Sequence, residues 1–475
     1  MIESFIHTSQ NNNFYIYDDH SRLSMLVHPE IRKVHEKSTD VDSFYLQKYE
    51  YLRKHGFFAK PKVSNFETLS EETVKTSIIE TQGITFEVTD FCNLNCTYCA
   101  YGELYEGFDT RSQKDISIRS AKKLLKYIFE FKSKNKNLSI GFYGGEPLLN
   151  MNFIKQIVEA SDQLNVEKEM IISFTITTNA TLLHKYIHFF VANKFLLFIS
   201  LDGNEENHSY RVYRKNKKNS FQKVIENIDM IQREYPEYFA THVDFITVFH
   251  NRNSVKDIYE YIYTRYHKIP QISELALDDV KPDKKNIVES MYHSRKKSED
   301  EYKKEESNLL PKPYYNYELA DFLKFFSINF YVSHITALLY DEGKILPTST
   351  CLPFSKNIFL TNRNNILPCE KINYKYTLGK VDKDVMIDIP EITRQYNHYY
   401  DHLKKICQHC YAYRFCGVCM FHIEKFDKLD TEEFVCENFC DQKAFQNKLY
   451  RLVSFLEKHR IDIFQILELE NIKTE

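Results

Sequence analysis

The sequence predicts an α/β protein whose centre is a partial (β/α)6 barrel of the TIM type. Between about residues 83 and 280, short runs rich in β-branched and aromatic residues alternate with stretches whose apolar residues recur every three or four positions. This alternation favours parallel strands joined by right-handed helical crossovers, and six such units make a partial barrel or an open sheet. In either case ligands gather at the carboxyl ends of the strands. The eight cysteines beyond residue 100 all fall in 351–440, which adds a C-terminal cysteine-rich domain.

Each strand–helix unit can be placed along the chain. The first helix follows Ser117, whose hydroxyl suits an N-cap, and its apolar face runs from Ala121 to Ile128. Further helices are expected around 153–158, 183–191, 221–231 and 255–262. The strands that they join are expected at 83–89, 138–143, 171–178, 196–201, 241–249 and 272–277.

The ends of the chain predict smaller parts around this barrel. Two β-rich runs at 14–17 and 22–27 flank a turn, and Pro29 then opens a helix. This small N-terminal α+β extension either covers the barrel or offers an edge strand to an extended peptide. The expected parts are the extension at 1–80, the barrel at 81–282, a charged linker with bridging helices at 283–348, the cysteine-rich domain at 349–441 and a C-terminal helix at 442–475 that packs back on the protein.

Composition excludes several classes of protein. The 63 basic and 66 acidic residues leave little net charge, so no nucleic-acid partner is expected. The first residues lack a basic segment followed by an apolar core, and the most apolar run, 187–201, is too short to span a bilayer. We therefore expect no membrane association, a cytoplasmic location, and cysteines that act as reduced ligands.

The most informative motif directly follows the first expected strand. Cys92, Cys96 and Cys99 have the spacing C-x3-C-x2-C, with an aromatic residue before the last cysteine. Three thiolates can hold three corners of a [4Fe–4S] cluster and leave the fourth iron open, whereas an electron-transfer cluster usually has four cysteines. An open iron suits a cluster that binds a small molecule. On the triad alone, a chance or zinc arrangement remains the alternative.

The triad together with Gly-Gly-Glu-Pro at 144–147 resembles the radical S-adenosylmethionine (SAM) superfamily. The resemblance implies a [4Fe–4S] cluster that chelates SAM, glycines that let the backbone approach its methionine amino group, and polar groups at the strand ends that contact the rest of it. Either Arg211 or Arg214 would reach the SAM carboxylate, and for each of them a surface role is the alternative. On this basis the expected cofactor-binding residues are Tyr98, Gly144, Gly145, Glu146, Asn179, Ser200, Arg211 and Arg214, with Asp202 a weaker candidate. Glu103, Tyr105 and Asp202 are weak catalytic candidates, for which a structural role is the alternative, and no catalytic base is assigned.

The later cysteines look like the SPASM extension, which binds auxiliary [4Fe–4S] clusters in peptide-modifying radical SAM enzymes. Paired zinc sites are the alternative, because C-x2-C pairs suit tetrahedral zinc. Asn364 stands where the extension often has glycine, and asparagine also tolerates a left-handed turn. The resemblance implies two interleaved sets of four ligands. One set is Cys407, Cys410, Cys416 and either Cys436 or Cys440, and the other is Cys351, Cys369, Cys419 and the remaining late cysteine.

The segment 99–111 resembles the Cys-x-Tyr-Gly-Glu segment of the GG-Bacteroidales type of peptide maturases. This resemblance implies a radical SAM oxidoreductase that cross-links a ribosomally made precursor peptide, through a thioether or a carbon–carbon bond. It also implies an electron donor such as flavodoxin or ferredoxin. Two alternatives stay open: a related anaerobic sulfatase-maturating enzyme that forms formylglycine, and a non-catalytic scaffold that carries clusters or zinc and only binds peptide.

Overall fold

The computed structural model describes residues 4–19, 23–58, 66–108, 112–277, 279–305, 307, 309, 346–413 and 416–458. The chain forms two compact units. Unit 1 contains Met1–Thr68, Leu310–Thr350 and Asn397–Glu475, and unit 2 contains Leu69–Leu309 and Cys351–Tyr396. The part 310–345 of the expected bridging helices and the end of the expected C-terminal helix, 459–475, lie outside the described residues.

Unit 2 is built on a ten-stranded sheet whose centre is the predicted parallel array. Six strands lie side by side in sequence order and pair in parallel, as the alternation of the sequence predicts. They are β4 (Gly83–Thr89), β5 (Asn137–Gly144), β6 (Ile171–Thr178), β7 (Leu196–Ser200), β8 (Val243–Phe249) and β9 (Gln271–Glu274). The last strand ends three residues earlier than expected.

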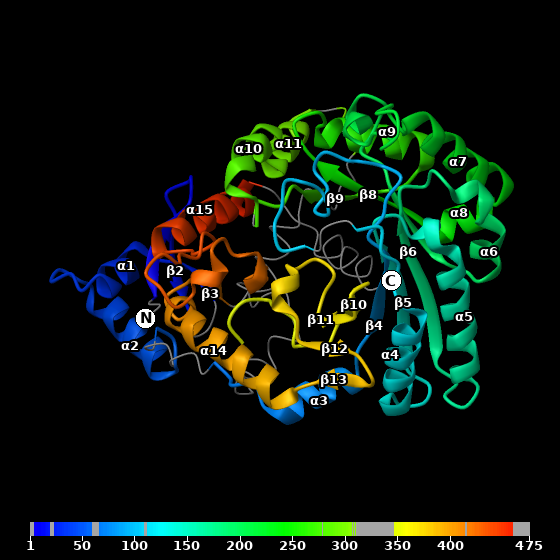
Figure 1. Cartoon of the computed structure of the whole chain (residues 1–475). Coiled ribbons are helices and arrows are strands. Elements are labelled where there is room, and N and C mark those ends of the chain that lie inside the picture. Colours follow the sequence, from blue (N-terminus) through cyan, green and yellow to red (C-terminus); the bar gives the residue numbers. More distant parts are fainter. Residues whose placement is uncertain are drawn as a thin grey trace. The chain divides into compact units, whose positions relative to one another are not determined.

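Helices cover this parallel array along its outer face (Figure 1). Their apolar residues lie on one side, and in the first helix Ala121, Leu124 and Leu125 are fully buried behind the predicted cap Ser117, whose hydroxyl accepts a hydrogen bond from the backbone N–H of Ser120. The helices that connect the strands are α4 (Ile118–Phe131), α5 (Met151–Asn165), α6 (Ile187–Ala192), α7 (Phe221–Glu234), α8 (Pro236–His242) and α9 (Val255–Tyr266). The charged stretch after β9 forms α10 (Lys285–Met291) and α11 (Arg295–Tyr302).

Four short strands that the sequence did not reveal extend the sheet beyond β4. β10 (Ile358–Leu360) pairs with β4 in parallel. β11 (Asn365–Leu367), β12 (Gly379–Val381) and β13 (Val385–Ile387) then follow in antiparallel order. Residues 351–396 therefore group with the barrel sheet, while the cysteines from Cys407 onward group with unit 1. The expected domain boundaries themselves stay predictions.

Unit 1 joins the start of the chain to its end. The predicted N-terminal hairpin is present as β2 (Phe14–Asp18) and β3 (Leu23–Val27), and β1 (Phe5–Thr8), which was not foreseen, completes the sheet in the order β1-β2-β3. The helices α1 (Pro29–His35) and α2 (Ser43–Lys54) follow, α1 beginning at the predicted Pro29.

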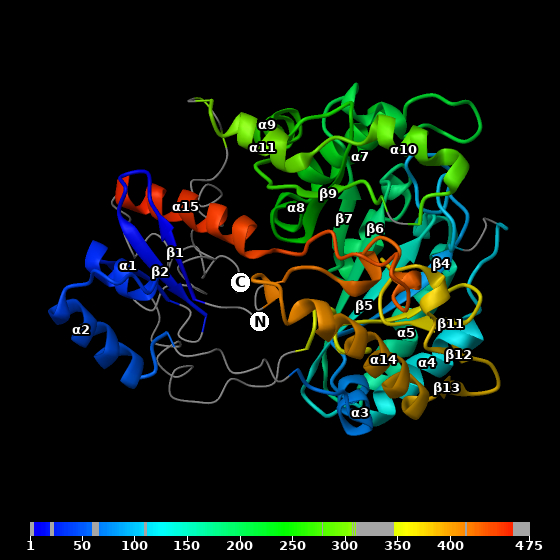
Figure 2. The same cartoon turned by 90° about the vertical axis from the view of Figure 1, so that its left-hand side faces the viewer.

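The C-terminal helix α15 (Gln442–Lys458) packs on this N-terminal sheet (Figure 2). Phe445 is fully buried against Phe5, Tyr17 and Tyr411 at centroid distances of 4.9–6.2 Å. Near the end of the helix, the Glu457 carboxylate accepts a hydrogen bond of 2.7 Å from the Tyr15 hydroxyl. No helix within the described residues is long and apolar enough to cross a membrane.

Candidate active site

The cysteine triad lies in the loop that follows β4, at the carboxyl edge of the parallel strands. Cys92 is buried, and Cys96 and Cys99 are partly buried. The segment 210–213 holds the loop in place, because the backbone N–H of Asn95 donates to the carbonyl of Val212 at 2.8 Å and that of Thr97 donates to Tyr210. The triad therefore occupies the position that the fold class predicts for a ligand site.

Gly144 and Gly145 bring the end of β5 directly against this loop. Gly144 has φ +124°, and a Cβ there would lie 2.5 Å from the carbonyl oxygen of Thr89. A Cβ on Gly145 would lie 2.1 Å from the carbonyl oxygen of Phe91. The backbone N–H groups of Gly145 and Glu146 donate to those same two carbonyls at 2.8 and 2.9 Å. The glycines are thus required for backbone packing beside Cys92, in addition to the cofactor approach expected from the sequence.

Glu146 is fully buried and joins the ends of β5 and β6. Its carboxylate accepts hydrogen bonds from the Thr178 hydroxyl at 2.7 Å and from the backbone N–H of Asn179 at 2.8 Å. A third bond, of 3.1 Å, comes from the backbone N–H of Leu148. Burial raises the pKa of Glu146 to about 7, against the opposing effect of these hydrogen bonds. The side chain locks the loop geometry of the site.

Asn179, which follows β6, contacts the cysteine loop directly. Its side-chain amide lies 3.7 Å from the Cys92 sulfur and donates to the Asn93 side-chain oxygen at 2.9 Å. The Asn179 side-chain oxygen accepts from the hydroxyl of Thr181 at 2.7 Å. Asn179 therefore fixes the position of one of the three thiols.

A buried ion pair of Asp202 and Arg211 lies in the part of the chain that connects β7 to β8. Arg211 donates two hydrogen bonds to the Asp202 carboxylate, at 2.8 and 2.9 Å, and the side chains are 8% and 0% exposed. The Tyr98 hydroxyl donates to the same carboxylate. Burial alone would raise the pKa of Asp202, but the Arg211 guanidinium and its hydrogen bonds hold that pKa well below its usual range. Three predicted residues thus form one network.

His250, which the sequence analysis did not single out, belongs to the same network. Its Nε2 lies 3.8 Å from the Asp202 carboxylate, and its ring stacks on Tyr98 with a centroid distance of 5.5 Å. It directly follows β8, so the rule that ligands gather at the carboxyl ends of strands was the available signal. The guanidinium of Arg214 lies 5.6 Å from the centroid of the Phe91 ring.

The remaining candidates divide between interior and surface. Ser200 is the last residue of β7. Tyr105 is buried, and its hydroxyl donates to the carbonyl of Ala276 at 3.0 Å. Glu103 is exposed. The last residues of the 99–111 segment, 109–111, lie outside the described residues.

Burial also raises the pKa of the Cys96 thiol, with the nearby Cys99 and Cys92 acting in the same direction and Arg211 opposing them. A Cys96 thiolate in this environment needs a strongly cationic partner, because desolvation and repulsion by its neighbours both favour the neutral thiol. Iron supplies such a charge. The donor set of Cys92, Cys96 and Cys99 therefore fits an iron–sulfur cluster.

A second buried cluster, missed by the sequence analysis, lies in unit 2 beside Cys99. The hydroxyls of Tyr101 and Tyr374 are 3.0 Å apart, and the Glu87 carboxylate on β4 accepts from the backbone N–H of Asn362 at 2.9 Å. Burial raises the pKa of Tyr143 there, and the charges that act on it in the same direction include Cys99 and Cys369. Cys99 of the triad and Cys369 thus both lie close enough to Tyr143 to raise the pKa of its hydroxyl.

The other cysteines are described unit by unit. In unit 2, Cys351 is exposed and Cys369 is partly buried. In unit 1, burial together with the nearby Cys410, Cys416 and Cys436 raises the pKa of the Cys407 thiol to about 12. The backbone N–H of Cys440 donates to the Cys410 sulfur at 3.3 Å. The same part of the chain contains Cys419, which is partly buried.

Comparison with known proteins gives the class. Residues 86–262 match the model of the Radical SAM superfamily. The cysteine-type anaerobic sulfatase-maturating enzyme of Clostridium novyi (strain NT) is 24% identical over 381 residues, which are 77% of this chain and 94% of that protein. The radical SAM cyclopropyl synthase TigE of Paramaledivibacter caminithermalis is 25% identical over 239 residues, covering 48% of this chain and 45% of that one.

The fold agrees with a solved relative. The structure of native anSMEcpe with bound AdoMet and Kp18Cys peptide has a TM-score of 0.50 and 20% identity, and it covers 79% of this chain and 99% of that one. The protein therefore contains a radical SAM domain at 86–262 and is similar to radical SAM enzymes. Within the superfamily it is related to sulfatase maturases and peptide modifiers, and it has the cysteine-rich C-terminal part of a radical SAM/SPASM maturase. The family implies a SAM-binding [4Fe–4S] cluster and SAM as cofactors.

Proposed function

We propose that the protein is a peptide maturase that removes hydrogen from a ribosomally made precursor peptide and installs a thioether or carbon–carbon cross-link. The observation that carries this proposal is the N-terminal sheet β1-β2-β3, which packs in one core with α15 and the Cys410 segment. At the edge of this sheet lies β3, on which Leu26 is 64% exposed. Such an edge suits an extended peptide that adds a further strand.

The residues at the carboxyl edge of unit 2 would hold the cofactors. Cys92, Cys96 and Cys99 would bind the cluster, with Asn179 positioning Cys92, and the Tyr98–Asp202–Arg211 network would line the SAM side. When bound, these cofactors supply a 5′-deoxyadenosyl radical that abstracts a hydrogen atom from the substrate. The protein's own task is to present one C–H bond and to exclude water, which the buried aromatic cluster of Tyr98, Tyr105 and Tyr210 favours.

The eight later cysteines would hold two auxiliary [4Fe–4S] clusters. Cys436 lies within electrostatic reach of Cys407, Cys410 and Cys416, which favours Cys436 over Cys440 as their fourth partner. Cys440 would then join Cys351, Cys369 and Cys419. A cross-link removes two hydrogens from the peptide, one as an atom and one as a proton with an electron. The auxiliary clusters would take that electron, and a flavodoxin or ferredoxin would reduce the SAM cluster.

Formylglycine formation is the second candidate, and the similarity to the sulfatase-maturating enzyme of Clostridium novyi favours it. That similarity involves 77% of this chain but 94% of the relative, so a sizeable part of this chain has no counterpart there. The N-terminal sheet favours the cross-linking enzyme, because enzymes of the sulfatase-maturing type usually begin close to their cysteine triad. A non-catalytic scaffold would require an inactive SAM site, and the intact triad with Gly144, Gly145 and Glu146 argues against it.

The test is anaerobic turnover of the reconstituted enzyme with SAM and reductant. We expect release of 5′-deoxyadenosine, and its persistence after replacement of Cys92, Cys96 and Cys99 by alanine would contradict the mechanism. Three four-iron clusters require about twelve irons per chain. The substrate would be a precursor peptide encoded beside the protein. Loss of two hydrogens together with cysteines that no longer react with an alkylating reagent indicates a thioether. The same loss with cysteines that still react indicates a carbon–carbon link. An aldehyde product would instead establish formylglycine formation.

A further inference from the structure

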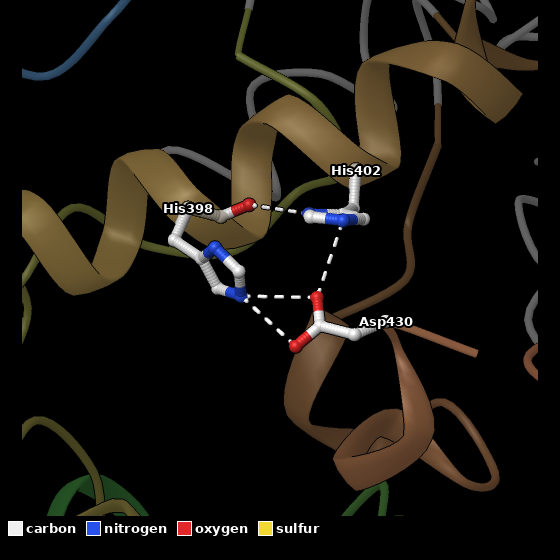
Figure 3. A group of neighbouring side chains, drawn as sticks. All are labelled: His398, His402 and Asp430. Carbon is white, nitrogen blue, oxygen red and sulfur yellow. Dashed lines mark hydrogen bonds and ion pairs between the residues drawn. The ribbon is translucent and has the colours of Figure 1, made fainter.

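Two histidines and one aspartate converge at the surface of unit 1. His398 and His402 stand one turn apart on α14 (Ile389–Cys407), and Asp430 faces both of them from the segment that precedes Cys436 (Figure 3). Their potential ligand atoms all lie within 4.8 Å of one another.

Buried aromatic packing fixes the two sides of this group relative to each other. On α14, the ring of Tyr399 lies 5.0 Å from that of Phe426, and Phe426 lies 5.7 Å from Phe421, centroid to centroid. Leu429, beside the aspartate, is buried. The segment that carries Asp430 is therefore packed against the helix and does not depend on the histidines for its position.

Hydrogen bonding sets the state of His402. Its Nδ1 lies 3.0 Å from the backbone carbonyl of His398, and a carbonyl only accepts, so Nδ1 carries the proton. In the neutral ring, Nε2 then presents a lone pair. That lone pair points at an Asp430 carboxylate oxygen 3.2 Å away, which is also an acceptor (Figure 3). Two acceptors at this distance need a positive charge between them.

The same oxygen of Asp430 lies 3.0 Å from Nε2 of His398. In its neutral form His398 can donate a proton from Nε2 to this oxygen, but the His402 contact needs either a cationic ring or a bound cation. With Nε2 of His398 unprotonated, one divalent cation would satisfy the carboxylate and both imidazoles, whose centroids are 4.8 Å apart. A second-shell bond from a ligand's Nδ1–H to a backbone carbonyl is also what metal-binding histidines generally have.

The spacing between the carboxylate oxygen and each imidazole nitrogen is close to that in a tetrahedral transition-metal site. Zinc bonds of about 2.0–2.2 Å to nitrogen and oxygen place neighbouring ligand atoms roughly 3.3 Å apart. The observed nitrogen–oxygen distances are 3.0 and 3.2 Å. The neighbouring charges are already engaged: Asp401 pairs with Lys404 at 3.0 Å, and Glu433 pairs with Lys428.

We propose that His398, His402 and Asp430 form a binding site for one divalent transition cation of the zinc class, separate from the iron–sulfur clusters. Two imidazoles and one carboxylate favour zinc over magnesium or calcium, which prefer oxygen ligands. Bound there, the ion ties α14, which ends at Cys407, to the segment that leads to Cys436. The site thus braces two parts of the chain that carry predicted auxiliary-cluster ligands.

The test uses the fully reconstituted holoenzyme, stripped of loosely bound metal with a chelator and then given zinc. Equilibrium dialysis should find one zinc per chain that millimolar magnesium does not displace. X-ray absorption at the zinc edge should show only nitrogen and oxygen neighbours at about 2.0–2.1 Å. A sulfur shell near 2.3 Å would place the zinc on cysteines and overturn the proposal, as would the absence of tight binding.

Two variants separate metal binding from a structural ion pair. Asp430→Asn keeps the size and one acceptor of the aspartate, and the double variant His398→Ala/His402→Ala removes both imidazoles. Each should lower zinc affinity at least tenfold, whereas the control His188→Ala/His242→Ala on the barrel should retain it. Zinc should also slow backbone hydrogen exchange in residues 420–430 of the wild type several-fold. The exchange rate of the same residues in the Asp430→Asn variant should not change when zinc is added. Equal affinity in all variants, or equal exchange with and without zinc, would overturn the proposal.

Discussion

Replacing Asp202 by asparagine isolates the electrostatic centre of the site. The change keeps the shape of the side chain but removes the charge that faces Arg211, to which it is joined by bonds of 2.8 and 2.9 Å. Both side chains are nearly inaccessible to solvent, so the arginine would remain buried without a counter-charge. Removal of one partner of such a pair costs about 3–5 kcal/mol in the free energy of unfolding. With an unfolding entropy of about 2.1 cal/mol/K per residue, the melting temperature of unit 2 should fall by roughly 5–8 °C.

The matched control is Asp229→Asn, which breaks a similar pair on the surface. Asp229 on α7 accepts from Arg265 on α9 at 2.6 Å, but the side chains of this pair are 36% and 43% exposed. Solvent screening limits its loss to about 0–1 kcal/mol. Thermal unfolding followed by circular dichroism compares the two variants, and Asp202→Asn/Arg211→Met should recover part of the loss. Equal melting temperatures for Asp202→Asn and Asp229→Asn would refute the argument that burial makes the Asp202–Arg211 pair dominant.

Three further perturbations test other parts of the structure. Gly145→Ala should destabilise unit 2 by at least about 1–3 kcal/mol and reduce 5′-deoxyadenosine release, because its Cβ would meet the Phe91 backbone. Gly141→Ala in β5 meets mainly the Thr85 side chain, and equal release from both variants would contradict this. Glu146→Gln should gain about 2 kcal/mol of stability relative to the wild type as the pH rises from 5.5 to 7. The folded-state pKa of Glu146, about 7, lies above the usual 4.5, so the stability of the wild type falls as the pH rises between these values. Melting curves of both proteins at the two pH values check this, and a constant difference would oppose it. Phe445→Ala should lower the free energy of unfolding by about 3–5 kcal/mol, because Phe445 packs in one core with residues of the N-terminal strands. It should also speed hydrogen exchange in both α15 and those strands, and loss of protection in α15 alone would show that the sheet does not depend on Phe445.

The central sheet could be predicted because each of its strands carries its own pattern. A run of seven or eight residues such as β4 or β6 shows its apolar character and its boundaries within the chain. Strands of three residues, such as β10 and β11, are too short to show a period. β10 forms because β4 offers it a partner more than 270 residues away in sequence, as in the Phe359–Thr85 pairing, and β11 then pairs with β10.

The candidate site was predictable in its members and much less so in their contacts. Asp202 and Asn179 were found because both follow parallel strands, whose ends converge at one edge. The bond between Asp202 and Arg211 depends on how the intervening turn folds, which no local pattern specifies. The His398 and His402 spacing of four residues was visible in the sequence, but only the aromatic packing around Phe426 shows that Asp430 joins them.

The hairpin of β10 and β11 explains how the chain returns from Cys369 toward the segment that begins at Cys351 in unit 2. The register Phe359↔Leu367, continued by two residues, puts Asn357 opposite Cys369, and the Asn357 side chain donates to the adjacent Glu370 at 2.8 Å. Asn364 makes the return possible, because it adopts φ +68° in the tight turn closed by its N–H to the carbonyl of Thr361, as the sequence analysis predicted. The chain is thereby brought back toward the segment that begins at Cys351. The proposed assignment of both cysteines to one auxiliary cluster therefore depends on the fold of this hairpin and not on the interval of eighteen positions between them.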